Sequence, residues 1–450
     1  MLELNRVRAM FLVNPLRILP VSFAVIIVIG TALLLLPIST SGNRETSLLD
    51  AIFTATSAVC VTGLSVVDTA AHWSVFGQGV ILALIQIGGL GIVTVVSIAV
   101  LLVSDRIGLS HTRVLGADVG TETYSGIGPL VRSVVITTLI FEVLFAAVLA
   151  FRFFVSHDYE LSKALLHGVF HSVSAWNNAG FALYSDNFVS FAGDWFISIA
   201  LCIAVILGGL GFPVLRAMAR QKTQWHLWSL HSKLTVVTTL VLIVTGTFLF
   251  LVLEWSNSRT LGALPEVSRP LAAFFHSVQT RTAGFNSVDT AALGEESLVV
   301  SIILMFIGGG SGSTAGGIKV TTFALLAFVI WAEFRGDRDV NMFGRRISEE
   351  VQRQALTIAL VAVGIFSSAT LLLMMLSDVS LSIAAFEVVS ALSTVGLSTG
   401  VTANEGSLSQ ILLTVLMFIG RVGPVTLAAA ITLRSRPHLF RYPTDRPLLG

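Results

Sequence analysis

The sequence predicts an all-α integral membrane protein made of four repeats, each with a spanning helix, a short re-entrant helix and a second spanning helix. Two observations predict this fold. Of the 450 residues, 54% are hydrophobic and only 12% are charged, which is about half the charged share of a soluble domain. Long apolar stretches also alternate with short segments of mixed polarity along the whole chain. These properties exclude an ordinary cytosolic enzyme.

The long apolar stretches are eight candidate spans, because a helix that crosses a bilayer needs about 20 mostly apolar residues. They cover residues 18–38, 78–103, 128–152, 193–216, 234–254, 297–331, 355–377 and 408–433. The first is long enough to remain as a membrane helix, so we do not expect a cleaved signal peptide. Four shorter segments lie between spans, at 46–62, 160–179, 265–283 and 380–395. They are too short and too polar to cross, which is typical of re-entrant pieces.

Each short segment ends in a similar sequence motif that contains a glycine. These glycines recur every 104 to 117 positions, as Gly63, Gly180, Gly284 and Gly396. A phenylalanine stands ten residues before each of them. A second glycine follows 24 to 28 residues later, in the next span: Gly88, Gly208, Gly308 and Gly420. Two glycines that recur four times at nearly constant spacing indicate an internal repeat. The predicted repeats are residues 1–104, 105–222, 223–340 and 341–450, the last including a C-terminal tail.

Basic residues predict the orientation, because cytoplasmic loops carry an excess of Lys and Arg. Nineteen of the 27 lie at the N-terminus, in the loops between repeats and in the tail. Six, among them Arg281, lie on the side of the re-entrant segments. We therefore expect a multi-pass protein of the cytoplasmic membrane with both termini in the cytoplasm and re-entrant segments that enter from outside.

Four re-entrant segments of one chain can close a ring around a single axis, which makes four M1–pore helix–M2 repeats around one pseudo-fourfold pore. The C-terminal end of each pore helix carries a partial negative charge that favours a cation. A ring of backbone carbonyls can replace the hydration shell of an alkali cation, and glycine turns its carbonyl inward at positive φ without steric cost. The predicted cation filter consists of Val61, Thr62, Gly63, Asn178, Ala179, Gly180, Thr282, Ala283, Gly284, Thr394, Val395 and Gly396.

The second span of the third repeat is expected to break. Residues 308–317 include six glycines, and each costs a helix about 1 kcal/mol. We expect a loop at membrane depth that lies across the permeation path as a gate. It consists of Gly308, Gly309, Gly310, Ser311, Gly312, Ser313, Thr314, Ala315, Gly316 and Gly317.

Two basic residues fall inside the predicted spans. Arg421 lies at the matching depth of the fourth repeat, and a charge within a span suggests a functional site. It is predicted to face the pathway, either as an electrostatic barrier or as a latch for the glycine-rich loop. Lys319 is expected to extend its amine toward the membrane surface or to pair with an acidic group.

Three acidic residues accompany the re-entrant segments. Asp68 and Asp289 each follow a filter glycine by five residues, so they either concentrate cations at the outer mouth or cap short helices. Glu387 lies early in the fourth pore helix and is expected to hold that segment by pairing with a base.

The composition argues against other classes of protein. A formal net charge of +1 gives no sign of a nucleic-acid partner. Both cysteines lie in apolar stretches and are expected to be buried, with no disulfide or metal site. Paired carboxylates and a nucleophile with a nearby base are absent, and residues 308–319 lack the Gly-Lys-Ser/Thr of a phosphate loop. We therefore do not expect an enzyme. The alternative is a cation secondary transporter of the Na⁺/K⁺ symporter type, which predicts inverted repeats and ionisable residues at mid-span.

The sequence resembles the membrane subunit of Ktr-type bacterial potassium uptake systems, within the Trk/Ktr/HKT superfamily. The motifs are Thr62-Gly63-Leu64, Asn177-Asn178-Ala179-Gly180-Phe181, Arg281-Thr282-Ala283-Gly284-Phe285-Asn286, Thr394-Val395-Gly396-Leu397 and Phe418-Ile419-Gly420-Arg421-Val422-Gly423-Pro424. The resemblance implies potassium uptake, because glycine at all four filter positions accompanies potassium in this superfamily, whereas serine at the first accompanies sodium.

The same resemblance implies partners and regulation. It implies a homodimer in the bilayer, with K⁺ bound at the filter carbonyls and no covalently bound cofactor. It also implies a separate cytosolic octameric ring that senses ATP/ADP or NAD. Ktr systems can depend on sodium, and the residues leave that question open.

Overall fold

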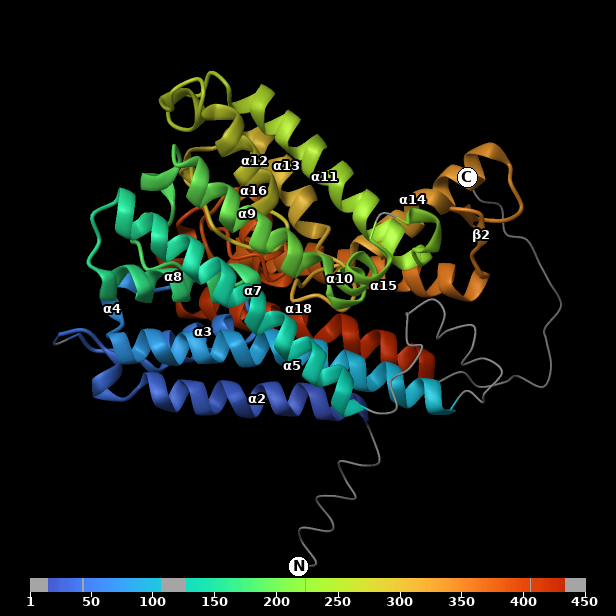
Figure 1. Ribbon diagram of the computed structural model, residues 1–450, viewed down its shortest axis with the longest axis horizontal. Helices are drawn as coiled ribbons and strands as arrows, with labels where there is room; N and C mark the ends of the chain where they lie inside the picture. Colours follow the sequence, from blue (N-terminus) through green and yellow to red (C-terminus); the bar gives the residue numbers. More distant parts are fainter. Residues whose placement is uncertain (1–14, 43, 107–126, 223, 405, 434–450) are drawn as a thin grey trace, which may run out of the picture.

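The computed structural model describes residues 15–42, 44–106, 127–222, 224–404 and 406–433. The predicted cytoplasmic N-terminus, most of the first cytoplasmic loop and the C-terminal tail lie outside these residues. The described chain is mostly helical (Figure 1). Strands β1 (Asn341–Met342) and β2 (Arg345–Arg346) form a short antiparallel hairpin in which Asn341 pairs with Arg346.

A long helix, a short helix and a further long or broken helix follow one another four times, and we name these groups units 1 to 4. Unit 1 has α2 (Pro15–Leu34), α3 (Leu48–Val59) and α5 (Val75–Arg106); unit 2 has α7 (Ile127–Ser156), α8 (Leu161–Trp176), α9 (Trp195–Leu210) and α10 (Phe212–Gln221); unit 3 has α11 (Leu230–Glu254), α12 (Arg269–Gln279), α13 (Glu295–Phe306) and α14 (Val320–Arg335); unit 4 has α15 (Glu349–Leu376), α16 (Leu381–Leu392) and α18 (Ser407–Leu433). The connections include η1 (Pro37–Ser39), α4 (Thr69–His72), η2 (Val189–Phe191), η3 (Trp225–Leu227), η4 (Leu261–Ala263), η5 (Thr290–Ala292) and α17 (Val401–Asn404).

Several helices have the length and composition that a membrane requires. Among the described residues, Val131–Ser156, Leu230–Glu254 and Glu349–Leu376 are each long and apolar enough to cross a bilayer. The broken pair α9 and α10 would count as a fourth span, and further apolar helices are shorter. The outer faces of the long helices expose apolar side chains such as Val143, Leu240 and Leu360, as expected of surfaces that face lipid.

The short helices lie at the centre of the molecule, surrounded by the long ones. Every residue from Phe53 to Val59 in α3 and from Ala384 to Leu392 in α16 is buried. A helix that is buried all round belongs to the core of a bundle. The phenylalanines that recur in the sequence account for part of this core, since Phe53, Phe170 and Phe386 are at most 1% exposed.

The apolar core closes in a circle. One cluster of buried side chains joins units 1 and 2, a second joins units 2 and 3, and a third joins units 3 and 4. A fourth cluster brings Phe53 and Leu64 of unit 1 together with Val388 and Met417 of unit 4. The last unit therefore packs against the first, and the four short helices surround a common centre.

The predicted continuous span 193–216 is instead two helices. The axis bends by 100° between α9 and α10, at Gly211, whose φ is +91°. The bend accommodates a loop from unit 3, because the Phe212 amide donates to the carbonyl of Gly312 at 3.2 Å. The sequence contained the signal for this break, Gly211 followed by Pro213, which is typical of a helix end and a new helix start.

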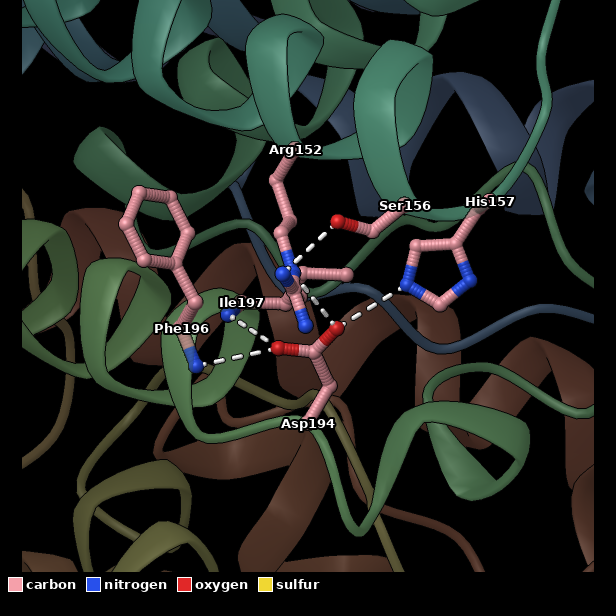
Figure 2. Close-up of polar contacts among 6 residues, drawn as sticks. All are labelled: Arg152, Ser156, His157, Asp194, Phe196 and Ile197. Carbon is pink, nitrogen blue, oxygen red and sulfur yellow. Dashed lines mark hydrogen bonds and ion pairs between the residues drawn. The ribbon is translucent and has the colours of Figure 1, made fainter.

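Asp194 ties the end of α7 to the start of α9 (Figure 2). One carboxylate oxygen caps α9 by accepting from the amides of Phe196 at 3.0 Å and Ile197 at 3.2 Å. The other accepts from Arg152 Nε and contacts His157 Nε2, both at 2.9 Å. This single carboxylate therefore serves both as a helix cap and as an ion-pair partner.

Asp194→Ala is expected to lower the unfolding temperature in detergent. The loss of an N-cap costs about 1 kcal/mol, and a partly exposed ion pair contributes up to about 1 kcal/mol more. Asp194→Asn should fall between wild type and Asp194→Ala, because asparagine retains the cap and loses the charge. Thermal unfolding of the three proteins measures the effect, and an Ala variant as stable as wild type would contradict it.

Candidate functional site

The four glycines of the re-entrant motifs, more than 100 residues apart in the chain, lie in a closed ring. A methyl group placed on Gly63 would stand under 3.0 Å from the carbonyl oxygen of Ala179, and one on Gly180 equally close to Ala283. The ring continues from Gly284 to the carbonyl of Val395 and from Gly396 back to that of Thr62. Each unit thus presses its glycine against the backbone of the next, and only glycine leaves room for that carbonyl.

The backbone through this ring has the same unusual conformation in all four units. The glycines have φ between +70° and +96°. The residues two positions earlier, Val61, Asn178, Thr282 and Thr394, have φ between +51° and +69°. Positive φ is rare in β-branched residues, and such strain persists only where the surrounding structure enforces it. In an ordinary strand successive carbonyls point to opposite edges of the strand, whereas alternating left- and right-handed residues can hold them on one side.

The short helices hold these segments by a common set of hydrogen bonds. The carbonyl of Ser57 accepts from Thr62 at 2.8 Å, that of Ser174 from Ala179 at 2.7 Å, and that of Ser390 from Val395 at 2.8 Å. The hydroxyls of Ser57 and Ser390 also accept from the ring glycine of their own unit at 3.1 Å. Unit 3 differs because Val278 stands in the serine position, and the carbonyl of Gln279 accepts from Ala283 instead.

The second set of repeated glycines brings the following helices against the ends of the short ones. A methyl group on Gly88, Gly208 or Gly420 would stand under 3.0 Å from the carbonyl of the last residue of α3, α8 or α16. The fourth member, Gly308, faces the carbonyl of Gly316 instead. Unit 3 has therefore exchanged this helix contact for a contact inside its own loop.

That loop lies between α13 and α14, where the sequence predicts the break. Its base is closed by the Gly308 amide, which donates to Ile318 at 2.8 Å, and by the Val320 amide, which donates to Gly309 at 3.1 Å. Its far part packs against other units. Gly316 leaves no room for a methyl group beside the Thr394 hydroxyl, and the Thr314 hydroxyl donates to the Gly208 carbonyl at 3.3 Å. The loop therefore lies directly against the fourth ring segment and unit 2.

Arg421 and Lys319 both bind this loop. The guanidinium of Arg421, which is 2% exposed, donates to the carbonyl of Thr314 and, at 3.4 Å, to that of Gly88. Lys319 donates to the carbonyl of Ala315 at 2.5 Å, and not to an acidic group as expected. Both cations therefore hold the loop through its backbone.

Arg281 is a site residue that was counted in the sequence only as one of six basic residues on the side of the re-entrant segments. It is 7% exposed and donates to the Thr239 carbonyl at 3.2 Å and to the Gly308 carbonyl at 3.4 Å. It connects the third ring segment to the first residue of the loop. A charged residue directly before Thr282 was the available signal, because a charge at membrane depth is rarely incidental.

The acidic residues near the ring have structural partners. Asp68 caps α4 through the amides of Ala70 and Ala71, and Asp289 caps η5 through that of Ala291. Both side chains are exposed. Glu387 holds the segment after Gly396, as expected, but its partner is not a base: it accepts from the Thr399 amide at 2.7 Å and from nearby hydroxyls. Among the described residues, no group of three or more His, Cys, Asp or Glu could hold a metal ion.

Comparison with known proteins identifies the family. The family model for TrkH, a cation transport protein, matches residues 12–440. The chain belongs to this family. Its fold agrees with that assignment: the crystal structure of the potassium transporter TrkH from Vibrio parahaemolyticus superposes with a TM-score of 0.74, covering 94% of this chain and 85% of that one at 18% identity. An all-α fold of the TrkH type is therefore confirmed.

Several relatives within the TrkH family are closer in sequence. The Ktr system potassium uptake protein B of Vibrio alginolyticus is 38% identical over 96% of this chain and 94% of its own length. The protein of the same name from Bacillus subtilis is 37% identical over 97% of both chains. The potassium/sodium uptake protein NtpJ of Enterococcus hirae is 33% identical over 97% of both. The resemblance to Ktr membrane subunits is thus confirmed along nearly the whole chain.

Proposed function

We propose that the chain is the ion-translocating subunit of a Ktr-type potassium uptake system, with K⁺ bound by backbone carbonyls of the glycine ring. The closed ring is the observation that carries the proposal. Four segments with matching positive φ surround one axis, and the carbonyls of Thr62, Ala179, Ala283 and Val395 lie between neighbouring units. Removing water from an ion is costly, of order 20 kcal/mol in the Born limit, so many preorganised oxygens are needed.

In this proposal the four units are the repeats 1–104, 105–222, 223–340 and 341–450, with eight spanning helices and four re-entrant pore helices. The C-terminal ends of α3, α8, α12 and α16 direct partial negative charge toward the ring. The membrane potential supplies the driving force. One charge that crosses 100 mV gains about 2.3 kcal/mol, which supports roughly 50-fold accumulation at 1.4 kcal/mol per tenfold.

The loop 308–317 is proposed as the gate, and Arg421 as its latch. The contact of Gly316 with the fourth ring segment and the bonds from Arg421 and Lys319 to loop carbonyls support this assignment. The two cations hold the loop through its backbone carbonyls, and the loop's own side chains are small, so it can be released with little change in side-chain packing. The buried guanidinium would also repel a cation that leaves the ring, so both roles considered for Arg421 are compatible with its position.

The cellular setting is proposed from the relatives and the charge pattern. The two Ktr relatives are each named as protein B of a Ktr system, which supports a separate partner protein. We propose that the chain forms a homodimer and that this partner is a cytosolic ring regulated by ATP/ADP or NAD, as the resemblance to Ktr systems implies. The name of NtpJ includes sodium, which makes sodium coupling part of the proposal to be tested. The excess of basic residues on one side supports a cell-membrane location with cytoplasmic termini.

Uptake of potassium in cells that lack their own uptake systems tests the proposal. We expect the chain, expressed with a candidate cytosolic partner, to restore growth at limiting potassium and to transport ⁸⁶Rb⁺ as a tracer. Omitting sodium from the same assay tests the coupling. Failure to transport by a protein that is shown to reach the membrane with its partner would contradict the proposal.

A further inference from the structure

A buried carboxyl group lies behind the second ring segment, within a polar triad that the proposed conduction path does not use. Glu142 of α7 is 5% exposed. It accepts from Gln86 Nε2 of α5 at 3.0 Å and from Asn177 Nδ2 at 3.1 Å. Asn177 is the C-cap of α8 and directly precedes Asn178, Ala179 and Gly180 of the ring. The triad thus joins units 1 and 2 at the level of the ring.

Asn177 connects the other two members of the triad. Its Nδ2 atom has two hydrogens, and Gln86 Oε1 and Glu142 Oε1 lie at 3.0 Å and 3.1 Å. A third oxygen, Val173 O at 2.9 Å, also accepts from the backbone amide of Asn177 at 3.1 Å. Both Nδ2 hydrogens are therefore available to hold Gln86 and Glu142 together.

The surroundings contain no charge that would compensate an ionised Glu142. Helix α7 packs against α5, α8 and α9. The described side chains of α5 include no titratable group. On α8, His167 contacts Tyr184 Oη and His171 contacts the amide of Leu183, so both are bonded elsewhere. Cys202 of α9 is buried. On α7 itself, Arg152 pairs with Asp194. Arg132 of α7 is exposed, and Lys163 of α8 lies over the ring of Tyr159. Among the described residues, no ion pair includes Glu142, and burial without a charged partner favours the neutral form of a carboxyl group.

The triad also lacks a counterpart in the other units. The residues that correspond to Asn177, three positions before each ring glycine, are Cys60, Arg281 and Ser393. Asn177 is further confined by Gly89, where a methyl group would stand under 3.0 Å from its amide oxygen. The carbonyl of Glu142 meanwhile accepts from Ser172 Oγ of α8 at 2.6 Å. Movement of Glu142 would therefore be transmitted to the end of α8 and to the strained Asn178, whose φ is +58°.

Building on the proposed function, we propose that Glu142, in its neutral form, is a positioning residue that sets the second ring segment and thereby the preference for K⁺ over Na⁺. The glycines provide the space for the carbonyls. The triad determines where the carbonyls of unit 2 lie within that space. Glu142 does not touch the ion, so its effect is on selectivity more than on the capacity to conduct.

The test compares Glu142→Gln with Glu142→Ala in the full chain with its cytosolic partner, reconstituted in liposomes. Glutamine has the shape of the neutral acid and donates a hydrogen, so Glu142→Gln should keep the wild-type ratio of K⁺ to Na⁺ uptake. Glu142→Ala should lower that ratio about tenfold, which corresponds to about 1.4 kcal/mol.

Two further variants keep the test decisive. Gln86→Leu removes a partner without touching the carboxyl and should lower the ratio even if Glu142→Ala does not fold. Glu254→Gln is the matched control, because Glu254 is also buried but accepts from Gly294 and Asn257 outside the ring, so the ratio should not change. A wild-type ratio in folded Glu142→Ala and Gln86→Leu, or a Glu142→Gln variant as impaired as Glu142→Ala, would overturn the inference. A wild-type protein without potassium uptake would instead refute the proposed function.

Discussion

Gly63→Ser is expected to lower the ratio of K⁺ to Na⁺ uptake by at least about tenfold, or about 1.4 kcal/mol, by admitting sodium. Gly63 has φ of +92°, a conformation in which a side chain is strained. Its Cα also faces the carbonyl of Ala179 so closely that any Cβ would stand under 3.0 Å from that oxygen. The carbonyl must therefore move, and the ring loses the spacing that suits a dehydrated potassium ion.

Paired uptake of ⁸⁶Rb⁺ and ²²Na⁺ into liposomes measures this effect. Gly79→Ser is the matched control from the same unit, because nothing lies within 4 Å of a Cβ at Gly79, and it should retain the wild-type ratio. Thermal unfolding of both variants separates a changed ring from a misfolded protein. Equal discrimination by folded Gly63→Ser and wild type would remove Gly63 from the filter.

Deletion of residues 311–314 is expected to raise potassium flux about tenfold or more in the absence of the cytosolic partner. These residues provide the Thr314 carbonyl that Arg421 binds and the Thr314 hydroxyl that contacts Gly208. They also provide the Gly312 carbonyl that accepts from Phe212. Without these contacts the loop is held against unit 2 mainly by the bond from the Gly310 amide to the Gly209 carbonyl at 2.8 Å, and we expect the path below the ring to open.

Arg421→Gln should produce a smaller increase in the same direction, because it removes the charge and shortens the reach to Thr314 without altering the loop. The ratio of K⁺ to Na⁺ uptake should stay at the wild-type value in both variants, since the ring itself is untouched. This separates an opened gate from a general leak. Unchanged or abolished flux in a correctly folded deletion variant would argue that the loop is a packing element and not a gate.

The repeated glycines allowed much of the site to be located from sequence. A position that needs positive φ or close backbone contact is usually occupied by glycine, so it can be recognised in the sequence. The two sets of glycines that recur in all four repeats indicated the ring segments and the contacts made by the following helices. The run of glycines at 308–317 indicated the break between α13 and α14. Gly308 was assigned to the second of these sets, and the structure shows that its role differs, since it closes the loop instead of contacting α12. The sequence showed where the repeated glycines lie, but it did not show which segment each of them contacts.

Side-chain partners were predicted less well. Arg281 was given no role, and Lys319 was expected at the membrane surface or beside an acidic group, although both bind backbone carbonyls of the loop. Glu387 was expected to pair with a base and instead binds Thr399 and neighbouring hydroxyls. Hydrogen-bond partners of a buried charge come from whichever segments pack around it, and those segments are distant in the chain. The charge and hydropathy of a sequence do not predict which distant segments pack together.

The order of residues alone predicts a membrane protein, a fourfold pattern and the positions where a helix must give way to another backbone conformation, because these depend on length, polarity and the conformational freedom of glycine. The closure of unit 4 onto unit 1, the bend at Gly211 and the contacts of Arg421 and Glu142 emerged in three dimensions. They join segments separated by up to several hundred residues, and such contacts arise from the packing of whole helices, which no local pattern encodes.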